Sequence, residues 1–315
     1  MKALLTPDML PPGGLLIACS SHEERCEGVV RRKGLWRPDS AILFHYDDPN
    51  PKREERHTRI LGMLKADGCE ASSVAYIEKN AAKSLHDNVG ILDAVLAQDA
   101  RRPIVLDISV FTKRHLLMML RWLDDRECWD RLVVVYSEPD NYLISRHIPL
   151  SFGISRIHHI PGFPAIPDMS RPLHLAVFLG YEGDRALAVY EYVQPIATTL
   201  FVPDPPYKPS WAGRTEDFNR EIILLAGKEA LRKADSVDPE GVAGALRMCF
   251  GEQTLRMSHG KLISPLGTKP QTLGVYMYAR NLEDPPGIVY ASPLRHNHDF
   301  YSEGIGNTWL LKRLS

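Results

Sequence analysis

The sequence lacks the patterns that mark most secreted, membrane-embedded and metal-binding proteins. It has few cysteines and no C-x-x-C pair, the five being Cys19, Cys26, Cys69, Cys128 and Cys249. An odd number without paired spacing argues against a disulfide scaffold or a zinc knuckle and suits a reducing compartment. No apolar run approaches the roughly 20 residues that a membrane-spanning helix needs. The N-terminal MKALLTPDMLPPGG does not read as a signal peptide. We therefore expect a cytoplasmic protein with no membrane partner.

An excess of one charge is also missing. Lysine and arginine total 38, aspartate and glutamate 39, and the net charge is −1. Such a chain has no global basic field, so duplex nucleic acid is not an expected partner, although a local basic pocket remains allowed. The P-loop, the Rossmann G-x-G-x-x-G and the hydrolase G-x-S-x-G motifs are absent, which lowers hydrolase and dehydrogenase interpretations. We expect no cofactor.

What the sequence does contain is an alternation of short apolar runs and amphipathic segments. The first half predicts strands at 14–20, 41–46, 73–77, 104–108 and 132–136, with helices at 23–32, 53–66, 85–97 and 113–123. Residues 142–172 are rich in Pro, Gly and His and suggest a hairpin or linker. The pattern restarts with strands at 173–180, 199–202, 261–264 and 288–291 and helices at 185–193, 217–232, 239–250 and 270–278, while the tail 301–311 fits neither class. This alternation predicts βαβ units with parallel sheets.

The two halves share four short signatures in the same order, at nearly equal distances along the chain. The matching pairs are Glu24-Arg25 with Asp184-Arg185, Leu43-Phe44-x-x-Asp47-x-Pro49 with Leu200-Phe201-x-x-Asp204-x-Pro206, Ser109-x-x-Thr112-Lys113 with Ser264-x-x-x-Thr268-Lys269, and Tyr136-x-x-Pro139 with Tyr290-x-x-Pro293. The alternative is that all α/β units share strand-then-turn chemistry. We expect an internally duplicated α/β protein with two tandem Rossmann-like, mostly parallel sheets, in domains 1–165 and 166–315.

The shared polar residues follow predicted strands, and ligands of open α/β sheets bind at the carboxyl ends of strands. After the first strand of each half the candidate ligand-binding residues are Ser20, Ser21, Glu24 and Arg25, and Glu182, Asp184 and Arg185. A helix start attracts phosphate, and arginine adds a planar bidentate donor. The alternative is that these residues cap the helix and form ion pairs.

The loops after the fourth strand of each half combine hydroxyls and cations at a strand-to-helix turn, a plausible anion nest. Their candidate residues are Asp107, Ser109, Thr112, Lys113 and Arg114, and Ser264, Gly267, Thr268 and Lys269. Glycine there would let backbone approach a phosphate closely. Capping hydroxyls with a solvated lysine are the alternative. His158-His159 and His296-Asn297-His298-Asp299 are weaker metal candidates without a known ligand spacing, so no metal site is predicted.

The fourth-strand loops carry a family resemblance. Asp107-x-Ser109-x-x-Thr112-Lys113 resembles the D-x-[ST]-x-G-[TS]-[KR] loop of CRISPR-associated Rossmann-fold (CARF) sensor domains, and Ser264-Pro-Leu-Gly267-Thr268-Lys269 resembles it again. Phe111 replaces the glycine in the first half. The resemblance implies ligand loops after strands one and four and binding of cyclic oligonucleotides. The fused double version of that family is called SAVED and serves as a sensor in bacterial anti-phage signalling.

Three functions follow as expectations. The first is a nucleotide-sensing or cyclic-oligonucleotide-sensing module of a prokaryotic anti-phage defence system, acting with a separate effector protein. The second is a metal-independent phosphodiesterase or nucleotide hydrolase on the same scaffold, using Ser109, Thr112, Lys113 and Lys269. The third is a structural subunit of a defence complex, whose loops serve only as helix caps. Whether the chain is an enzyme is left open by the sequence.

Overall fold

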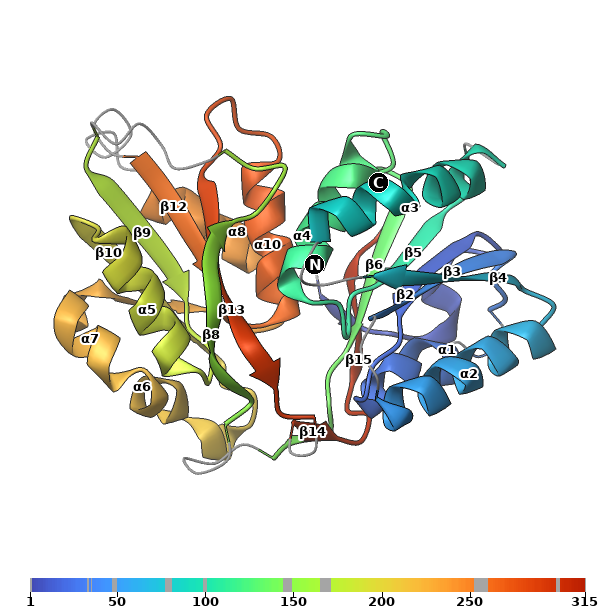
Figure 1. The fold of residues 1–315 in the computed structure, drawn as a ribbon, viewed down its shortest axis with the longest axis horizontal. Helices are drawn as coiled ribbons and strands as arrows, with labels where there is room; N and C mark the ends of the chain where they lie inside the picture. The colour runs from blue at the N-terminus through green and yellow to red at the C-terminus, as the bar shows by residue number, and fades with distance from the viewer. Residues whose placement is uncertain are drawn as a thin grey trace. The chain divides into compact units, whose positions relative to one another are not determined.

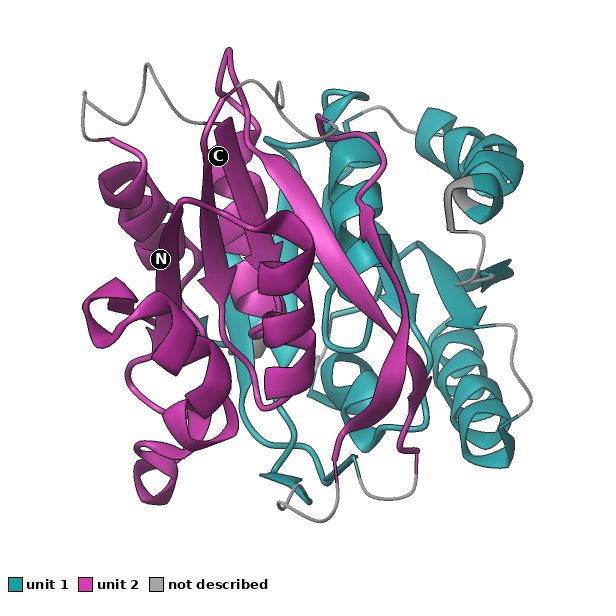
Figure 2. Ribbon diagram, turned by 60° about the vertical axis from the view of Figure 1, so that its left-hand side comes forward, with its two compact units in different colours: residues 1–143, 301–315 teal, residues 144–300 magenta. Residues whose placement is uncertain are grey.

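The computed structural model describes residues 2–32, 34, 36–46, 50–76, 81–98, 101–143, 149–164, 171–251, 260–298 and 301–314. The chain divides into two compact units. Unit 1 comprises Met1–Leu143 and Tyr301–Ser315, and unit 2 comprises Ile144–Phe300 (Figure 2). The sequence placed one boundary, between residues 165 and 166, whereas the chain passes from unit 1 to unit 2 and then returns to unit 1.

Unit 1 is a doubly wound sheet in the order β1-β15-β6-β5-β2-β3-β4. Its parallel strands are β2 (Leu15–Cys19), β3 (Ser40–Tyr46), β4 (Glu70–Tyr76), β5 (Ile104–Asp107) and β6 (Leu132–Ser137), joined at one edge by antiparallel β15 (Thr308–Lys312) and β1 (Ala3–Leu4). The helices are η1 (Pro7–Met9), η2 (Glu24–Glu27), α1 (Gly28–Arg32), α2 (Pro51–Ala66), α3 (Ala81–Ala97) and α4 (Lys113–Asp124). Helices α1 and α2 cover one face and α3 and α4 the other (Figure 1), which is why the central strands are apolar throughout. A short antiparallel pair, β7 (Asn141–Tyr142) and β14 (Ser302–Glu303), completes the unit.

Unit 2 repeats this arrangement with the order β11-β10-β9-β12-β13-β8. Its parallel strands are β9 (Leu173–Phe178), β10 (Ala197–Pro203), β11 (Leu231–Ala234), β12 (Gly260–Pro265) and β13 (Gly287–His296), and β8 (Ser151–His159) pairs antiparallel with β13. The helices are α5 (Gly183–Val193), η4 (Pro209–Trp211), α6 (Arg214–Phe218), α7 (Arg220–Ala226), η5 (Lys228–Ala230), α8 (Pro239–Cys249) and α10 (Lys269–Ala279). Taken in chain order, the five parallel strands of the two sheets correspond one to one. The predicted fold class, tandem duplicated Rossmann-like sheets, is confirmed.

The antiparallel strands that pair with β6 and β13 are exchanged between the two halves of the sequence. Strand β8 follows β6 in the chain but pairs with β13, where His159 lies opposite Val289. Strand β15 follows β13 in the chain but pairs with β6, where Trp309 lies opposite Tyr136. The segment 142–172, expected as a hairpin or linker, thus supplies an edge strand of unit 2, and the unassigned tail supplies a strand inside the sheet of unit 1.

One predicted helix is replaced by several short elements. The sequence suggested a continuous helix over 217–232, but the chain forms the ends of α6, then α7, η5 and the start of β11. Gly227 ends α7 with a φ of +85°, a backbone conformation that L residues rarely adopt. The turn there directs the chain into β11, the edge strand of the sheet.

The strand register identifies which residues of the two halves are equivalent. Cys19 ends β2 opposite Phe44, and Phe178 ends β9 opposite Phe201. Phe44 and Phe201 belong to matching signatures, whose Asp47 and Pro49 lie outside the described residues. Following the strand register across each sheet from these pairs identifies two further pairs of equivalent residues. They are Asp107 with Ser264 at the ends of β5 and β12, and Tyr136 with Tyr290 in β6 and β13. The sequence signature had instead matched Ser264 with Ser109.

Removal of residues 301–315 is expected to unfold unit 1 selectively. Leu310 and Leu311 are each about 1% exposed, and burying a leucine contributes about 1.5–3 kcal/mol. Loss of β15 also leaves one edge of β6 unpaired, while its other edge still pairs with β5. Hydrogen exchange should show lost protection in β6 and retained protection in β12. A control chain lacking only residues 313–315 keeps β15 and should match the full-length protein. Equal protection of β6 in both truncated chains would contradict the role given to β15.

Candidate functional site

The loops singled out in the sequence follow adjacent strands in each unit. In unit 1 they follow β2 and β5, and in unit 2 they follow β9 and β12, and these strands pair directly. Because the strands of each pair are parallel, both loops lie at the same carboxyl edge of their sheet. Each unit thus brings its own two predicted loops together.

In unit 1, the first-strand loop is organised around the fully buried Arg25. Its Nε and Nη2 donate to the Glu23 carboxylate at 2.8 and 2.9 Å, and its Nη1 donates to the Tyr136 hydroxyl at 3.3 Å. The guanidinium also lies 5.9 Å from the centre of the Tyr136 ring. Ser302 Oγ donates to Glu23 at 2.7 Å, so β14 helps hold the ion pair. This arginine is committed to contacts within the protein.

Unit 2 builds the same cluster around Arg185, which is 4% exposed. Its Nη1 donates to Glu182 at 2.7 Å, its Nε donates to the Ala291 carbonyl at 2.8 Å, and its guanidinium lies 4.9 Å from the centre of the Tyr290 ring. Ser151 of β8 donates to the same Glu182 carboxylate. Two equivalent Glu–Arg–Tyr clusters therefore lie at the carboxyl edges of the two sheets, each reached by a residue from the exchanged half of the chain.

The acidic partners of these arginines are not the residues that the signatures aligned. Glu23 and Glu182 each lie four residues beyond the end of their strand and make the ion pairs. Glu24, with its side chain 47% exposed, lies 3.5 Å from Arg56 instead, and Asp184 is exposed. The residue missed in the sequence, Glu23, could have been found by counting from the strand end.

Loss of the buried carboxylate is expected to destabilise unit 1 strongly. Glu23→Ala leaves the Arg25 guanidinium buried without its counter-ion, a change that costs about 3–5 kcal/mol. Glu24→Ala is the matched control and should cost under about 1 kcal/mol, because that side chain is half exposed and solvent screens its charge. Urea unfolding of both variants measures the difference. Similar midpoints for the two variants would show that the buried ion pair adds little.

The remaining first-strand candidates of unit 1 are also buried. Ser20 is fully buried, and its Oγ lies 3.3 Å from the Phe44 carbonyl and 2.9 Å from His57 Nδ1. Ser21 is 5% exposed and its Oγ accepts from the Glu23 N–H at 3.3 Å. These hydroxyls fix the conformation of the loop that places Glu23 and Arg25.

The fourth-strand loop of unit 1 is centred on a buried carboxyl. Asp107 is 3% exposed and accepts hydrogen bonds from the N–H and the hydroxyl of Ser109. Ser109 Oγ in turn accepts from the Ser137 N–H at 2.7 Å. Burial raises the pKa of Asp107 to about 6, against the lowering effect of the Ser109 hydrogen bonds and of Arg25. Near pH 7.5 the Asp107 carboxyl is therefore ionised.

The N-cap residue of helix α4 forms its hydrogen bonds within the protein. Thr112 is the N-cap and accepts from the His115 N–H at 3.3 Å, while its own N–H donates to the Tyr46 hydroxyl at 2.7 Å. Phe111, which replaces the family glycine, is fully buried against Phe44 and His115. Lys113, which opens α4, is partly exposed, and Arg114 after it is 5% exposed.

In unit 2 the fourth-strand loop ends in a capping box. Thr268 Oγ accepts from the Gln271 N–H at 3.2 Å, and Gln271 Oε1 accepts from the Thr268 N–H at 2.9 Å. A Cβ on Gly267 would lie 1.9 Å from Gln271 Oε1, so the glycine makes room for the capping side chain. Pro270 removes another donor. Donors that open α10 are thus used by the protein itself, and an anion there depends mainly on side chains.

Four basic side chains of unit 2 gather at this edge. The pKa of His296 is lowered to about 4, chiefly by burial and also by the neighbouring charges of Arg185, His298 and Lys269, although Glu182 raises it. Lys269 opens α10, Arg185 lies in α5, and His296 ends β13. The two loops predicted from the sequence therefore converge here, together with two histidines that the sequence offered only as weak metal candidates.

A buried hydroxyl lies at the end of β12. Ser264 is fully buried, and within the described residues its Oγ makes no hydrogen bond. It occupies the position at which unit 1 has the Asp107 carboxyl. The same place in the two sheets is thus neutral in unit 2 and ionisable in unit 1.

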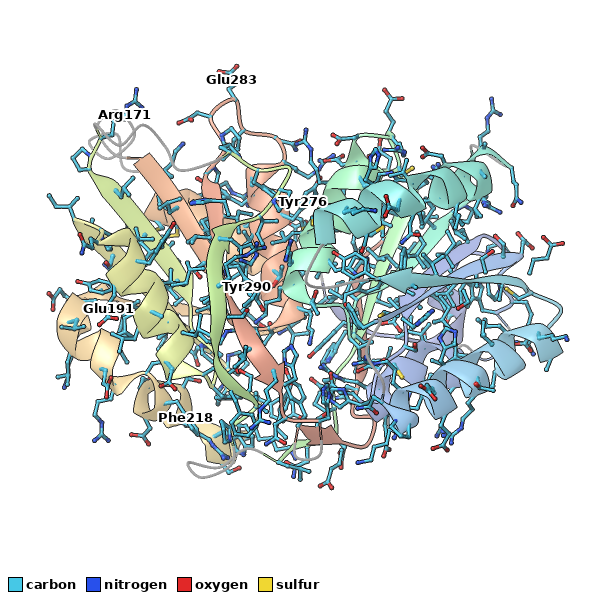
Figure 3. The ribbon with its side chains drawn as sticks, in the orientation of Figure 1. Arg171, Glu191, Phe218, Tyr276, Glu283 and Tyr290 are labelled. Carbon is cyan, nitrogen blue, oxygen red and sulfur yellow. The ribbon has the colours of Figure 1, made fainter. Side chains whose placement is uncertain are left out.

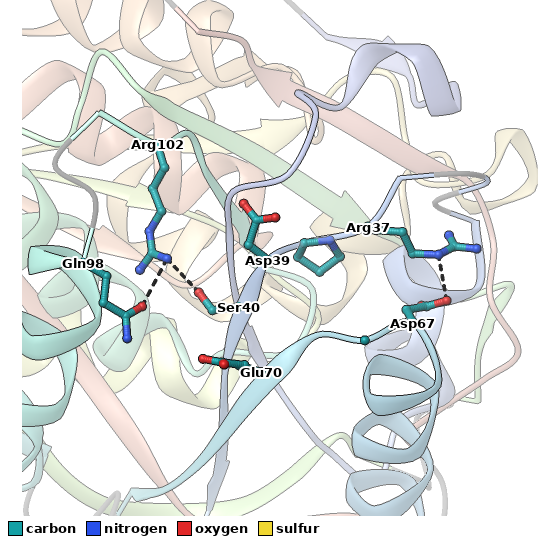
Figure 4. Close-up of a pocket in the computed structure, with 9 residues that line it drawn as sticks. Arg37, Asp39, Ser40, Asp67, Glu70, Gln98 and Arg102 are labelled. Carbon is teal, nitrogen blue, oxygen red and sulfur yellow. Dashed lines mark hydrogen bonds and ion pairs between the residues drawn. The ribbon is translucent and has the colours of Figure 1, made fainter.

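A pocket of about 380 Å³ lies at the opposite edge of the unit 1 sheet. Figure 4 shows Arg37, Asp39, Ser40, Asp67, Glu70, Gln98 and Arg102 among the residues that line it. Arg37 pairs with Asp67 at 2.8 Å, and Arg102 Nη1 donates to Ser40 Oγ at 3.0 Å. Ser40 and Glu70 begin their strands, so this pocket lies at the amino ends and contains none of the candidate ligand residues.

Two further expectations from the sequence concern metal ligands and membrane-spanning helices. His158 and His159 lie in β8, and the Asp299 of the His296 motif lies outside the described residues. Within the described ranges no three histidine, cysteine or acidic side chains gather as a metal site would require. No described helix has both the length and the apolar character that spanning a bilayer demands.

The chain matches no protein-family model and no curated protein. It is similar in fold to a solved structure described as a type III CRISPR defence DNA nuclease activated by cyclic oligoadenylate. The TM-score is 0.54 at 10% sequence identity, and the match covers 94% of this chain and 68% of that one. The tandem Rossmann-like arrangement is therefore shared with a protein of CRISPR defence.

Proposed function

We propose that this chain binds the phosphate of a nucleotide at the carboxyl edge of unit 2. The convergence of Arg185, Lys269, His296 and His298 carries the proposal. With both histidines neutral, the two cations Arg185 and Lys269 against the one acid Glu182 already leave the edge with an excess of positive charge, and protonation of a histidine adds to it. Arginine and lysine are the usual ligands of phosphate oxygens in proteins.

The binding mode follows from the capping box of α10. Because Thr268 and Gln271 use each other's N–H groups, the phosphate is held by side chains more than by backbone. Lys269 supplies a flexible ammonium at the helix start, and Arg185 keeps an Nη2 that makes no hydrogen bond within the described residues. The buried hydroxyl of Ser264 adds a donor beneath them.

Unit 2 is favoured over unit 1 by charge. The Asp107 carboxyl at the equivalent position is ionised near neutral pH and repels an anion, whereas Ser264 is neutral. Each guanidinium nitrogen of Arg25 donates to Glu23 or Tyr136, whereas Arg185 keeps an Nη2 without a hydrogen bond within the described residues, so Arg25 contributes less to an external ligand. The candidate ligand loops of unit 1, which include Lys113 and Thr112, are proposed as a secondary or structural site.

At the level of the whole chain, we propose a nucleotide-sensing module of a prokaryotic anti-phage defence system that acts with a separate effector. The fold shared with a defence nuclease activated by cyclic oligoadenylate supports this role. It also suggests a cyclic oligonucleotide as the first ligand to test.

Substitution of Lys269 is expected to weaken binding. Loss of one charge-assisted hydrogen bond should lower the affinity of Lys269→Ala for cyclic tetra-adenylate by about tenfold to hundredfold. Lys113→Ala should have a smaller effect, because the loop that carries Lys113 also carries Asp107. The control is Lys228→Ala, an exposed lysine on η5. Calorimetric titration measures all three, and equal affinities would reject the unit 2 site.

The same samples distinguish a sensor from a phosphodiesterase. Anion-exchange chromatography after long incubation should return the nucleotide intact if the chain only binds it. If the wild-type protein forms linear products and Lys269→Ala does not, the chain is a phosphodiesterase instead.

Binding should strengthen as the pH falls. In the unliganded protein the pKa of His296 is about 4, and a bound phosphodiester adds negative charge that raises this pKa. Binding then takes up a proton once the pH is below this raised pKa, so affinity should rise as the pH falls from that value toward 4, by at most tenfold per pH unit. Cyclic di-adenylate is a suitable ligand, because its phosphodiesters do not titrate in this range. His296→Asn should flatten the profile, and an unchanged slope in that variant would reject His296 as the titrating group.

A further inference from the structure

A cluster of aromatic side chains lies beside the cationic edge of unit 2. Tyr181 follows β9 directly, in the loop that carries Glu182 and Arg185, whereas Tyr207, Trp211 and Phe218 follow β10, the neighbouring strand. Figure 3 shows Phe218 at the end of unit 2 toward which the strands run and Glu283 at the opposite end. The cluster thus shares the carboxyl edge with the proposed phosphate site.

The rings contact one another around Trp211. The ring centres of Tyr181 and Trp211 are 5.1 Å apart, and those of Tyr207 and Trp211 are 5.6 Å apart, both edge to face. Tyr181 also lies 6.2 Å from Phe218. The Arg214 guanidinium covers the Trp211 ring at 3.9 Å. Trp211 is buried, but Tyr181, Tyr207, Arg214 and Phe218 all remain partly exposed, so aromatic and guanidinium surface still faces solvent.

The cluster is fixed to the loop that carries Arg185. A Cβ on Gly183 would lie 1.9 Å from the Phe218 carbonyl oxygen, so the start of α5 and the end of α6 are in direct contact. Asn219, 1% exposed, donates through Nδ2 to the Gly180 carbonyl at 2.7 Å and to the Thr215 carbonyl at 2.8 Å. The aromatic rings are therefore held in place relative to the cationic site rather than carried on a separate loop.

Partly exposed aromatic rings and arginine planes are the surfaces on which unpaired bases stack. A phosphate site alone does not require them, and a purely structural cluster would be covered as Trp211 is. We propose that Tyr181, Tyr207, Arg214 and Phe218 form a base-stacking subsite for a purine of the nucleotide bound at the Arg185–Lys269 edge. This inference rests on the proposed function, because the phosphate site places the base.

The test compares three probes that differ only in what accompanies the phosphate, namely AMP, ribose 5-phosphate and inorganic phosphate. AMP is expected to bind about tenfold to hundredfold more tightly than ribose 5-phosphate. Tyr181→Leu and Arg214→Gln should remove most of this advantage while leaving the affinity for inorganic phosphate unchanged. Tyr192→Leu, an exposed tyrosine on α5, is the control and should keep it.

Tryptophan emission gives a second readout. Trp211 is the single tryptophan between residues 144 and 300, so AMP should quench a component of emission that is missing in Trp211→Phe. If ribose 5-phosphate and AMP bind equally well and both depend on Lys269, the stacking subsite is rejected and the phosphate site stands. If no probe binds in a Lys269-dependent manner, both are rejected. If Tyr181→Leu and Arg214→Gln still bind AMP more tightly than ribose 5-phosphate by the wild-type factor, the stacking subsite is also rejected.

Discussion

Pairing between β15 and β6, and between β8 and β13, is the constraint on which the rest of the structure depends. Each sheet is completed by an antiparallel strand from the other half of the sequence. The same segments bring Ser302 to Glu23 and Ser151 to Glu182, so they also hold the acidic partners of the two buried arginines. The exchanged antiparallel strand of each sheet and the ion pair at the carboxyl edge of that sheet are therefore stabilised together.

The two units have equivalent frameworks but differ at a few positions. Both units keep a Glu–Arg–Tyr cluster, but the carboxyl of Asp107 at the end of β5 is replaced in unit 2 by the hydroxyl of Ser264, one residue before the end of β12. The proposed function attributes the difference in anion binding between the two edges to this single charge. Under that proposal, duplication followed by such a change gives unit 1 a structural role and unit 2 a binding role on the same fold.

The sequence predicted the elements whose signals are local. Buried parallel strands such as Leu132–Ser137 are continuous apolar runs, and the duplication follows from matched turns. It did not predict β8 or β15, because an antiparallel partner more than a hundred residues away leaves no periodic signal in its own segment. The helix expected over 217–232 was wrong because the left-handed conformation of Gly227 outweighs good helix-forming residues on both sides. At the site, the candidate arginines were found, but their partner Glu23 was missed and Gly267 was given a ligand role, whereas its space is filled by Gln271.

The exchanged strands also order events during synthesis. The ribosome releases β6 long before β15, because β15 begins 308 − 137 = 171 residues after β6 ends. Until residue 308 emerges, the nascent first domain has an apolar strand, Leu132–Ser137, with one edge unpaired, and such edges recruit other chains. Until β15 has been synthesised, unit 1 of such a protein is prone to aggregation, and the nascent chain is a natural client for chaperones that shield exposed strands.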